Sequence, residues 1–183
     1  MRPIRYNVAI SLDGYIGPED HSTTWITDDP SIDFDDLYSQ FDTFIMGRIS
    51  YDVMKAQGDA NPLRNQPKGR VLVVSQSADP AAYPEVTILG RDFISEIKKL
   101  KEQEGKDIWL FGGGQLLGAC LDAGLVDTIE AAVMPILLRG GIKMVSDAPA
   151  RDGMVGTKLE LVSVRQLEKS GILLTTYKVK SNE

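Results

Sequence analysis

Residues 107–127 read DIWLFGGGQLLGACLDAGLVD, and the rest of the chain is best understood from this stretch. Residues 108–111 form a short apolar run with the length and bulk of a strand that is buried on both faces. Three glycines follow, and beyond them Leu116, Leu117, Cys120, Leu121 and Leu125 recur at helical spacing. The pattern predicts a strand, a glycine turn and a helix.

The glycine turn has two interpretations. Glycines let the backbone approach a ligand closely, and the start of the following helix offers unpaired N–H groups and a positive dipole end to an anion. The turn therefore suits a phosphate. Alternatively, the glycines only make a tight turn, because the sequence is neither GxGxxG nor a Walker loop.

Length and composition are typical of a small globular protein. The 183 residues, 43% hydrophobic and 25% charged, predict a single domain, residues 1–183, around one core. A net charge of −6 and a pI near 4.9 disfavour broad nucleic-acid binding. No apolar run reaches the roughly 20 residues of a membrane helix, and the N-terminus does not resemble a signal peptide. We therefore expect a cytoplasmic protein that binds neither nucleic acid nor membrane.

The residues that commonly bind metals are scarce. Cys120 is the only cysteine, so neither an internal disulfide nor a thiolate cluster can form, and its place on the apolar helical face predicts a packing role. His21 is the only histidine and lies in the polar segment GPEDHSTT, which predicts a solvated loop residue. We expect no metal site.

Strands and helices alternate along the chain and then give way to a hairpin. Ser31 is the expected cap of a helix whose apolar face carries Phe34, Leu37, Tyr38 and Phe41. The long segment 11–24 has no helical period and predicts a lid, and residues 137–149 are expected to be irregular. The pattern predicts an α/β fold with a mostly parallel sheet and an antiparallel edge. The expected strands are 4–10, 44–47, 71–74, 86–89, 108–111, 128–133, 159–167 and 172–180, and the other helices are 47–54, 92–103 and one after the three glycines.

Three predicted strands end in residues suited to phosphates and hydroxyls. These ends are Gly47-Arg48-Ile49-Ser50, Ser75-Gln76-Ser77 and Gly112-Gly113-Gly114-Gln115. Because ligands of open α/β sheets collect beyond the carboxyl ends of parallel strands, one dinucleotide could contact all three. The serine hydroxyls with Arg48, and with Arg91 as a further candidate, favour a ribose bearing a 2′-phosphate, hence NADP rather than NAD.

Four segments carry a resemblance to a known family. They are AISLDGYIG, DTFIMGRISYDVM, VLVVSQS and IWLFGGGQLLGACLDAGLVDTIEAAVMPILLRGG, and the resemblance that they carry covers nearly the whole chain. The sequence resembles the dihydrofolate reductase fold and, more closely, the C-terminal domain of the bacterial bifunctional deaminase-reductase RibD. The resemblance implies a three-layer α/β/α dihydrofolate reductase-like fold. The zinc signature of the deaminase half, HxE and PCxxC, is absent from this sequence, so a stand-alone reductase-like domain is expected.

The resemblance also implies roles for individual residues. Ala9 and Ile16 are expected to border the nicotinamide of NADPH. The implied phosphate-binding residues are Gly47, Arg48 and Ser50, with Gly112, Gly113, Gly114 and Gln115 on the pyrophosphate. Ser75 and Gln76 are expected at the adenosine end.

In the dihydrofolate reductase pattern an acid lies on the helix before the MGR strand, which makes Asp33 the candidate proton donor. Asp35, Asp36 and Asp13 are its rivals. All of these acids could instead be residues that the helix dipole favours near a helix start.

The implied activity is that of an NADPH-dependent reductase of a pyrimidine-like or pterin-like heterocycle, resembling 5-amino-6-(5-phosphoribosylamino)uracil reductase of riboflavin biosynthesis. Reduction of dihydrofolate is one alternative, and a non-catalytic NADP-binding module is another. A homodimer, formed through the sheet edge or the LLRGG segment (137–141), is implied by the resemblance alone.

Overall fold

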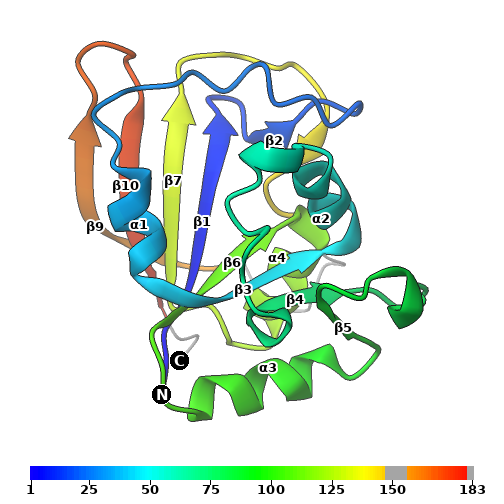
Figure 1. Ribbon diagram of the computed structural model, residues 1–183. Coiled ribbons are helices and arrows are strands. Elements are labelled where there is room, and N and C mark those ends of the chain that lie inside the picture. The colour runs from blue at the N-terminus through cyan, green and yellow to red at the C-terminus, as the bar shows by residue number, and fades with distance from the viewer. Residues whose placement is uncertain (147–155, 181–183) are drawn as a thin grey trace.

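A computed structural model of the chain describes residues 1–146 and 156–180. Their main feature is an eight-stranded sheet with the order β5-β4-β3-β6-β1-β7-β10-β9 (Figure 1). The first six strands in this order are parallel, whereas β10 is antiparallel to both β7 and β9. The strands are β1 (Ile4–Ser11), β3 (Phe41–Gly47), β4 (Val71–Val74), β5 (Thr87–Leu89), β6 (Asp107–Gly112), β7 (Thr128–Met134), β9 (Leu159–Gln166) and β10 (Leu173–Val179).

Helices cover both faces of the sheet. On one face α3 (Phe93–Glu102) and α4 (Gly114–Asp122) pack over β1, β6 and β3, and the core there includes Ile97, Leu117 and Cys120. On the other face α1 (Phe34–Ser39) and α2 (Arg48–Lys55) pack over β3, β4 and β6. The three layers and the antiparallel C-terminal hairpin confirm the predicted fold class. Short 3₁₀ turns complete the connections: η1 (Gly58–Ala60), η2 (Lys68–Arg70) and η3 (Pro80–Ala82).

Cys120 has the packing role that its sequence position predicts. Its side chain is fully buried, and burial raises the pKa of the thiol to about 12 because the thiolate would lose its hydration. The thiol is therefore protonated at neutral pH and behaves as a small apolar group.

The start of α1 differs from the prediction. Asp33, not Ser31, is the N-cap, because the Asp33 carboxylate accepts a hydrogen bond of 2.9 Å from the backbone N–H of Asp36. The Ser31 hydroxyl instead donates to Asp29. The helix is also shorter than predicted, since Phe41 lies in β3 and faces Trp109.

The segment 137–149 was predicted to be irregular, and its described part contains a short strand. That strand, β8 (Ile142–Lys143), pairs antiparallel with β2 (Tyr15–Gly17), so the predicted lid is fastened to a second, two-stranded sheet. Residues 147–149 lie outside the described residues. The two backbones approach each other so closely beside this pair that a Cβ at Gly141 would overlap the carbonyl oxygen of Gly17. Only glycine fits at position 141 for this reason.

Asp29, which lies in the segment between the lid and α1, fastens that segment to the C-terminal hairpin. Its buried carboxylate accepts hydrogen bonds from the Ser170 hydroxyl (2.6 Å), from the Ser31 hydroxyl (2.5 Å) and from the Ser31 backbone N–H (2.9 Å). The Ser170 hydrogen bond is the first cause that lowers the pKa of Asp29 to about 2, followed by those from Ser31. The charged carboxylate is therefore the form that holds the two segments together.

This lowered pKa predicts how stability depends on pH. Because the folded pKa of Asp29 lies below the unfolded value near 3.9, its contribution is present above about pH 4 and is lost as the pH falls toward 2. Urea unfolding at several pH values should show that Asp29→Asn has a smaller loss of stability over this interval than the unmodified chain. Equal losses of stability in the two proteins would contradict the claim that the charged Asp29 carboxylate stabilises the fold. Asp28→Asn, which changes the adjacent exposed carboxylate, is the matched control.

Candidate functional site

The predicted strand ends lie at one edge of the sheet. In the parallel register Gly47 is opposite Val74, Val74 is opposite Leu89, and Met46 is opposite Gly112. The turns that follow β3, β4, β5 and β6 therefore leave the sheet on the same side (Figure 1). The segments that follow β3, β4 and β6 therefore converge at one edge of the sheet, as the sequence predicts.

The turns after β3 and β6 touch each other. A Cβ built on Gly47 would lie 3.7 Å from the carbonyl oxygen of Gly112 and 3.9 Å from the backbone nitrogen of Gly113. A Cβ on Gly113 would lie 3.7 Å from Ile16 Cδ1 and 3.9 Å from Ser50 Oγ. The lid strand β2 and the first turn of α2 thus meet the glycine turn, and five of the predicted cofactor residues are brought together: Ile16, Gly47, Ser50, Gly112 and Gly113.

The glycine turn is fixed by its surroundings. Gly112 has φ +95°, and a Cβ there would lie 3.1 Å from the Tyr6 ring. The Gly112–Gly113 peptide bond is cis. A Cβ on Gly114 would overlap the carbonyl oxygen of Lys143, and the backbone N–H of Ser146 donates to the Gly114 carbonyl at 3.1 Å. Glycine is therefore required at both ends of the turn.

Both helices at this edge begin without a side-chain cap. The N-cap residues are Gly47 for α2 and Gly113 for α4, and neither provides a side-chain acceptor for the first-turn N–H groups. These donors and the positive ends of two helix dipoles are directed to the same edge of the sheet. Gln115, in the first turn of α4, is exposed beside them. This arrangement fits an anion with more than one phosphate.

Four more of the predicted cofactor residues lie on the rim of this edge. The Arg48 guanidinium is 42% exposed and donates to Asp52 at 2.8 Å. Ser75 follows β4, and its hydroxyl oxygen accepts a hydrogen bond of 3.0 Å from the backbone N–H of Ala78. Gln76 and Arg91 are exposed after β4 and β5, respectively.

Ala9 belongs to the face of β1 that lies under the lid. It packs against a small core around Trp25, Met134 and Ile172, to which Ile26 also contributes. Ala9 and Ile16 are the two residues expected beside the nicotinamide. Ala9 lies on β1 and packs against the Trp25 core, whereas Ile16 belongs to β2 in the lid itself.

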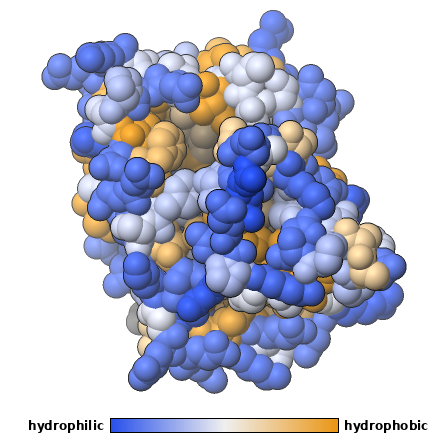
Figure 2. Space-filling view, viewed as in Figure 1, coloured by the Kyte–Doolittle hydropathy of each residue, from blue (hydrophilic) through white to orange (hydrophobic). Residues whose placement is uncertain are grey.

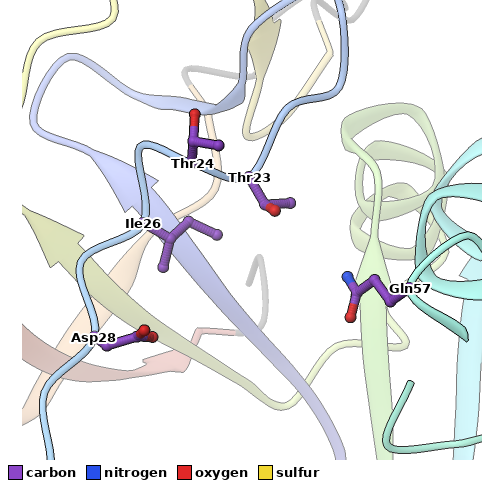
Figure 3. A pocket seen from close by; sticks show the side chains of 5 residues that line it. All are labelled: Thr23, Thr24, Ile26, Asp28 and Gln57. Atoms are coloured by element: carbon purple, nitrogen blue, oxygen red, sulfur yellow. The ribbon is translucent and has the colours of Figure 1, made fainter. Parts of the chain in front are cut away.

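A polar cleft opens between the lid and the end of α2. It has a volume of about 550 Å³ and is lined by Thr23, Thr24, Ile26, Asp28 and Gln57. Figure 3 shows the first four residues on the lid side and Gln57 across the opening, with strands of the sheet below them. In the space-filling view this face is hollowed near the ends of β1 and β7, and apolar residues line the hollow (Figure 2).

Sequence reasoning missed Asp28 and Gln57. The only signal for Asp28 was its position in the segment that joins the predicted lid to α1. Gln57 lies in the polar stretch after α2, which has no motif of its own. Their proximity depends on how the lid folds back over the sheet, and the sequence pattern does not encode that geometry.

The acids predicted as proton donors have other contacts. Asp33 is exposed, and its carboxylate caps α1. The Asp13 carboxylate accepts hydrogen bonds from the Ser11 hydroxyl and from the backbone N–H groups of Leu138 and Arg139, at 2.6, 3.1 and 2.7 Å. These bonds, that from Ser11 first, lower the pKa of Asp13 and fasten the lid to the segment after β7. The catalytic role of Asp33 stays a prediction.

The described residues contain neither a metal-binding cluster nor a membrane-spanning helix. Within residues 1–146 and 156–180, no group of three or more His, Cys, Asp or Glu side chains could hold a metal ion. No helix in those ranges is long and apolar enough to cross a membrane.

Comparison with known proteins places the chain in a family. Residues 2–173 match the model of the RibD C-terminal domain. The uncharacterized protein YyaP of Bacillus subtilis is 27% identical over 186 residues, which covers 96% of this chain and 94% of YyaP.

Two solved structures share the fold. A pyrimidine reductase-like protein of Corynebacterium diphtheriae matches with a TM-score of 0.70 and 15% identity, over 99% of this chain and 93% of the other. Dihydrofolate reductase of Enterococcus faecalis matches with a TM-score of 0.62 and 16% identity, over 98% and 97% of the two chains. The chain belongs to the RibD C-terminal domain family of reductase-like proteins and has a dihydrofolate reductase-like fold.

Proposed function

We propose that this protein is an NADPH-dependent reductase of a pyrimidine-like or pterin-like heterocycle. The observation that carries the proposal is the contact between the turns after β3 and β6, where Gly113 lies next to Gly47, to Ser50 and to Ile16 of the lid. Two uncapped helix starts at this contact suit a pyrophosphate. The polar cleft beside the lid offers room for a second, smaller molecule.

The polar groups of the rim favour NADPH over NADH. Arg48 and Arg91 provide positive charge, and Ser75 and Gln76 provide neutral hydrogen-bonding groups, at the strand ends where the adenosine part would lie. A guanidinium matches the geometry and charge of a ribose 2′-phosphate, whereas NAD sites usually place an acid on the ribose hydroxyls.

The chemistry requires a hydride and a proton. NADPH, when bound, supplies the hydride. Ala9 and Ile16 would position the nicotinamide through apolar contacts, and the lid would exclude water from it. A carboxyl group could bind the nitrogen-bearing edge of the heterocycle and hold the proton there.

Asp28 is better placed than Asp33 for this carboxyl role. Asp28 lines the cleft, whereas Asp33 caps α1 with its carboxylate. We expect Asp28→Asn to lower kcat/KM by about 100-fold or more without weakening NADPH binding, since removing a proton-transfer group typically costs this much. Asp33→Asn should have little effect, because asparagine also caps helices. The reverse result would assign the role to Asp33, and Asp35→Asn on the exposed side of α1 is the control.

Two alternatives differ in their observable consequences. Dihydrofolate reductase activity would appear as oxidation of NADPH with dihydrofolate as the sole second substrate. A non-catalytic module would bind NADPH without oxidising it in the presence of pyrimidines and pterins, and Asp28→Asn would then have no kinetic consequence.

The cofactor proposal is tested by fluorescence titration with NADPH and with NADH. We expect saturable binding of NADPH and binding of NADH that is weaker by at least about tenfold, or about 1.4 kcal/mol. Arg48→Ala and Arg91→Ala should each narrow this difference by weakening NADPH binding alone. Absence of NADPH binding, or a preference for NADH, would refute the proposal.

A further inference from the structure

The segment that contains the lid and α1 differs in charge from the rest of the chain. Residues 6–47 include nine Asp or Glu residues and no Lys or Arg. With His21 neutral their formal charge is −9, whereas the whole chain carries −6, so the remaining residues carry a net charge of +3. The negative charge of the protein is thus concentrated in the segment that includes the lid side of the polar cleft.

Most of these acids have no basic partner. Asp42 is paired with Arg2 and Arg70, and Asp13 is held by backbone N–H groups after β7. Within residues 1–146 and 156–180 the other seven form no ion pair with Lys or Arg, and six of them are exposed. These seven acids are Glu19, Asp20, Asp28, Asp29, Asp33, Asp35 and Asp36. The lid side of the cleft therefore belongs to a negative surface that no base of the described chain neutralises by contact.

The lining of the cleft has the same character. Of its five residues only Asp28 is charged, and the other four are neutral. Figure 3 shows Asp28 on the lid side and the amide of Gln57 across the opening. Lys55, the base nearest to Gln57 in the sequence, is bound to Glu85. The lining thus offers hydrogen-bond partners to a neutral ring but no positive charge to an anion.

The edge proposed for NADPH has the opposite character. Arg48, Arg91 and the uncapped starts of α2 and α4 all favour negative charge there. An anion in the neighbouring cleft would meet repulsion from Asp28 and from the acids around it. Charges that line a cleft act more strongly than charges on an open surface, because the protein walls focus their field.

We propose that the cleft selects a heterocycle that carries neither phosphate nor carboxylate. The kind of ring follows from the proposed function, on which this selectivity rests. The preferred substrate is then a neutral or cationic pyrimidine or pterin, rather than a phosphoribosyl pyrimidine or a folate with its glutamate carboxylates. Asp28 excludes anions by its charge and accepts hydrogen bonds from N–H groups of the ring.

Calorimetric titration with two pairs of compounds tests this selectivity, on the protein alone and on the protein saturated with NADPH. One pair is 5-amino-6-(5-phosphoribosylamino)uracil and its dephosphorylated form, and the other is dihydropteroate and its uncharged carboxamide. At about 0.01 M ionic strength, where the Debye length is about 30 Å, the uncharged member of each pair should bind at least about tenfold more tightly. At about 1 M, where that length is about 3 Å, the two affinities should approach each other.

A base added to the lining should reverse the selectivity. Thr23 is exposed, and its side chain makes no hydrogen bond within the described part of the chain. Thr23→Arg should therefore tighten binding of the charged member of each pair by at least about tenfold relative to the uncharged member. Thr23→Gln, which adds bulk without charge, should keep the ratio of the unmodified chain. So should Gln103→Arg, which adds the same charge at the exposed end of α3.

The outcomes separate this selectivity from the reductase proposal. Equal or tighter binding of the charged compounds overturns the selectivity, as does a preference that persists unchanged at about 1 M salt, or the absence of binding by all four compounds. Oxidation of NADPH is measured separately. Binding with the expected preference but without oxidation would refute the reductase activity and leave the selectivity supported.

Discussion

Replacing Gly113 by valine should lower the affinity for NADPH by about 100-fold or more, or about 2.7 kcal/mol, while leaving the protein folded. The reason is the position that the side chain would take. A Cβ on Gly113 meets only ordinary contacts, with Ile16 Cδ1 at 3.7 Å and Ser50 Oγ at 3.9 Å. The two methyl groups of valine would extend beyond it, into the space through which the pyrophosphate of the proposed NADPH would reach the backbone of the turn.

The measurement is NADPH titration combined with thermal unfolding. Gly69→Val is the matched control, because nothing lies within 4 Å of a Cβ at Gly69 and this residue is outside the candidate site. Normal NADPH binding by folded Gly113→Val would show that the glycine turn does not hold the cofactor. The NADPH affinity of Gly113→Ala should lie between that of Gly113→Val and that of the unmodified chain, since alanine adds only the Cβ itself.

Replacing Gly114 by alanine should destabilise the protein by about 3 kcal/mol. Its Cβ would overlap the carbonyl oxygen of Lys143 and would lie 3.2 Å from the carbonyl oxygen of Met144 and from the backbone nitrogen of Ser146. All three neighbours are backbone atoms, so relief requires the segment 143–146 to move off the start of α4. Movement would also break the hydrogen bond from the Ser146 backbone N–H to the Gly114 carbonyl.

Urea unfolding provides the measurement for Gly114→Ala. Gly69→Ala is again the control, with an expected change within about 0.5 kcal/mol for an open surface position. A loss below about 1 kcal/mol for Gly114→Ala would mean that the segment 143–146 rests less firmly on α4 than the structure indicates. The two expected results together would show that Gly114 is required for the fold and Gly113 for NADPH binding.

Local sequence patterns predicted most of the fold. Buried strands such as β4 and β6 are continuous apolar runs, and α3 and α4 have clear helical periodicity, so both kinds of element could be identified without knowledge of distant contacts. Convergence of the strand ends followed from the expected parallel sheet. The start of α1 was misjudged because Ser31 and Asp33 are both good caps, and tertiary contacts decided between them: Asp29 engages Ser31 and leaves the cap to Asp33.

The parts of the site that depend on the lid could not be predicted. β8 is only two residues long and exists because it pairs with β2 from a distant part of the chain. Asp28 and Gln57 lie on opposite sides of the cleft although 28 residues separate them in the sequence, and no motif marks either one. Asp29, which fastens the segment after the lid to Ser170, is likewise recognisable only from contacts between segments far apart in sequence.

The central claim is that the turns after β3, β4 and β6 hold one NADPH molecule, and a crystal structure of the protein with NADPH tests it most directly. We predict that the pyrophosphate contacts the first-turn N–H groups of α4 and the Ser50 hydroxyl, that the 2′-phosphate lies near Ser75 and Arg48 or Arg91, and that the nicotinamide lies between Ala9 and Ile16. NADPH bound elsewhere, or an edge that stays empty at millimolar NADPH, would contradict the account.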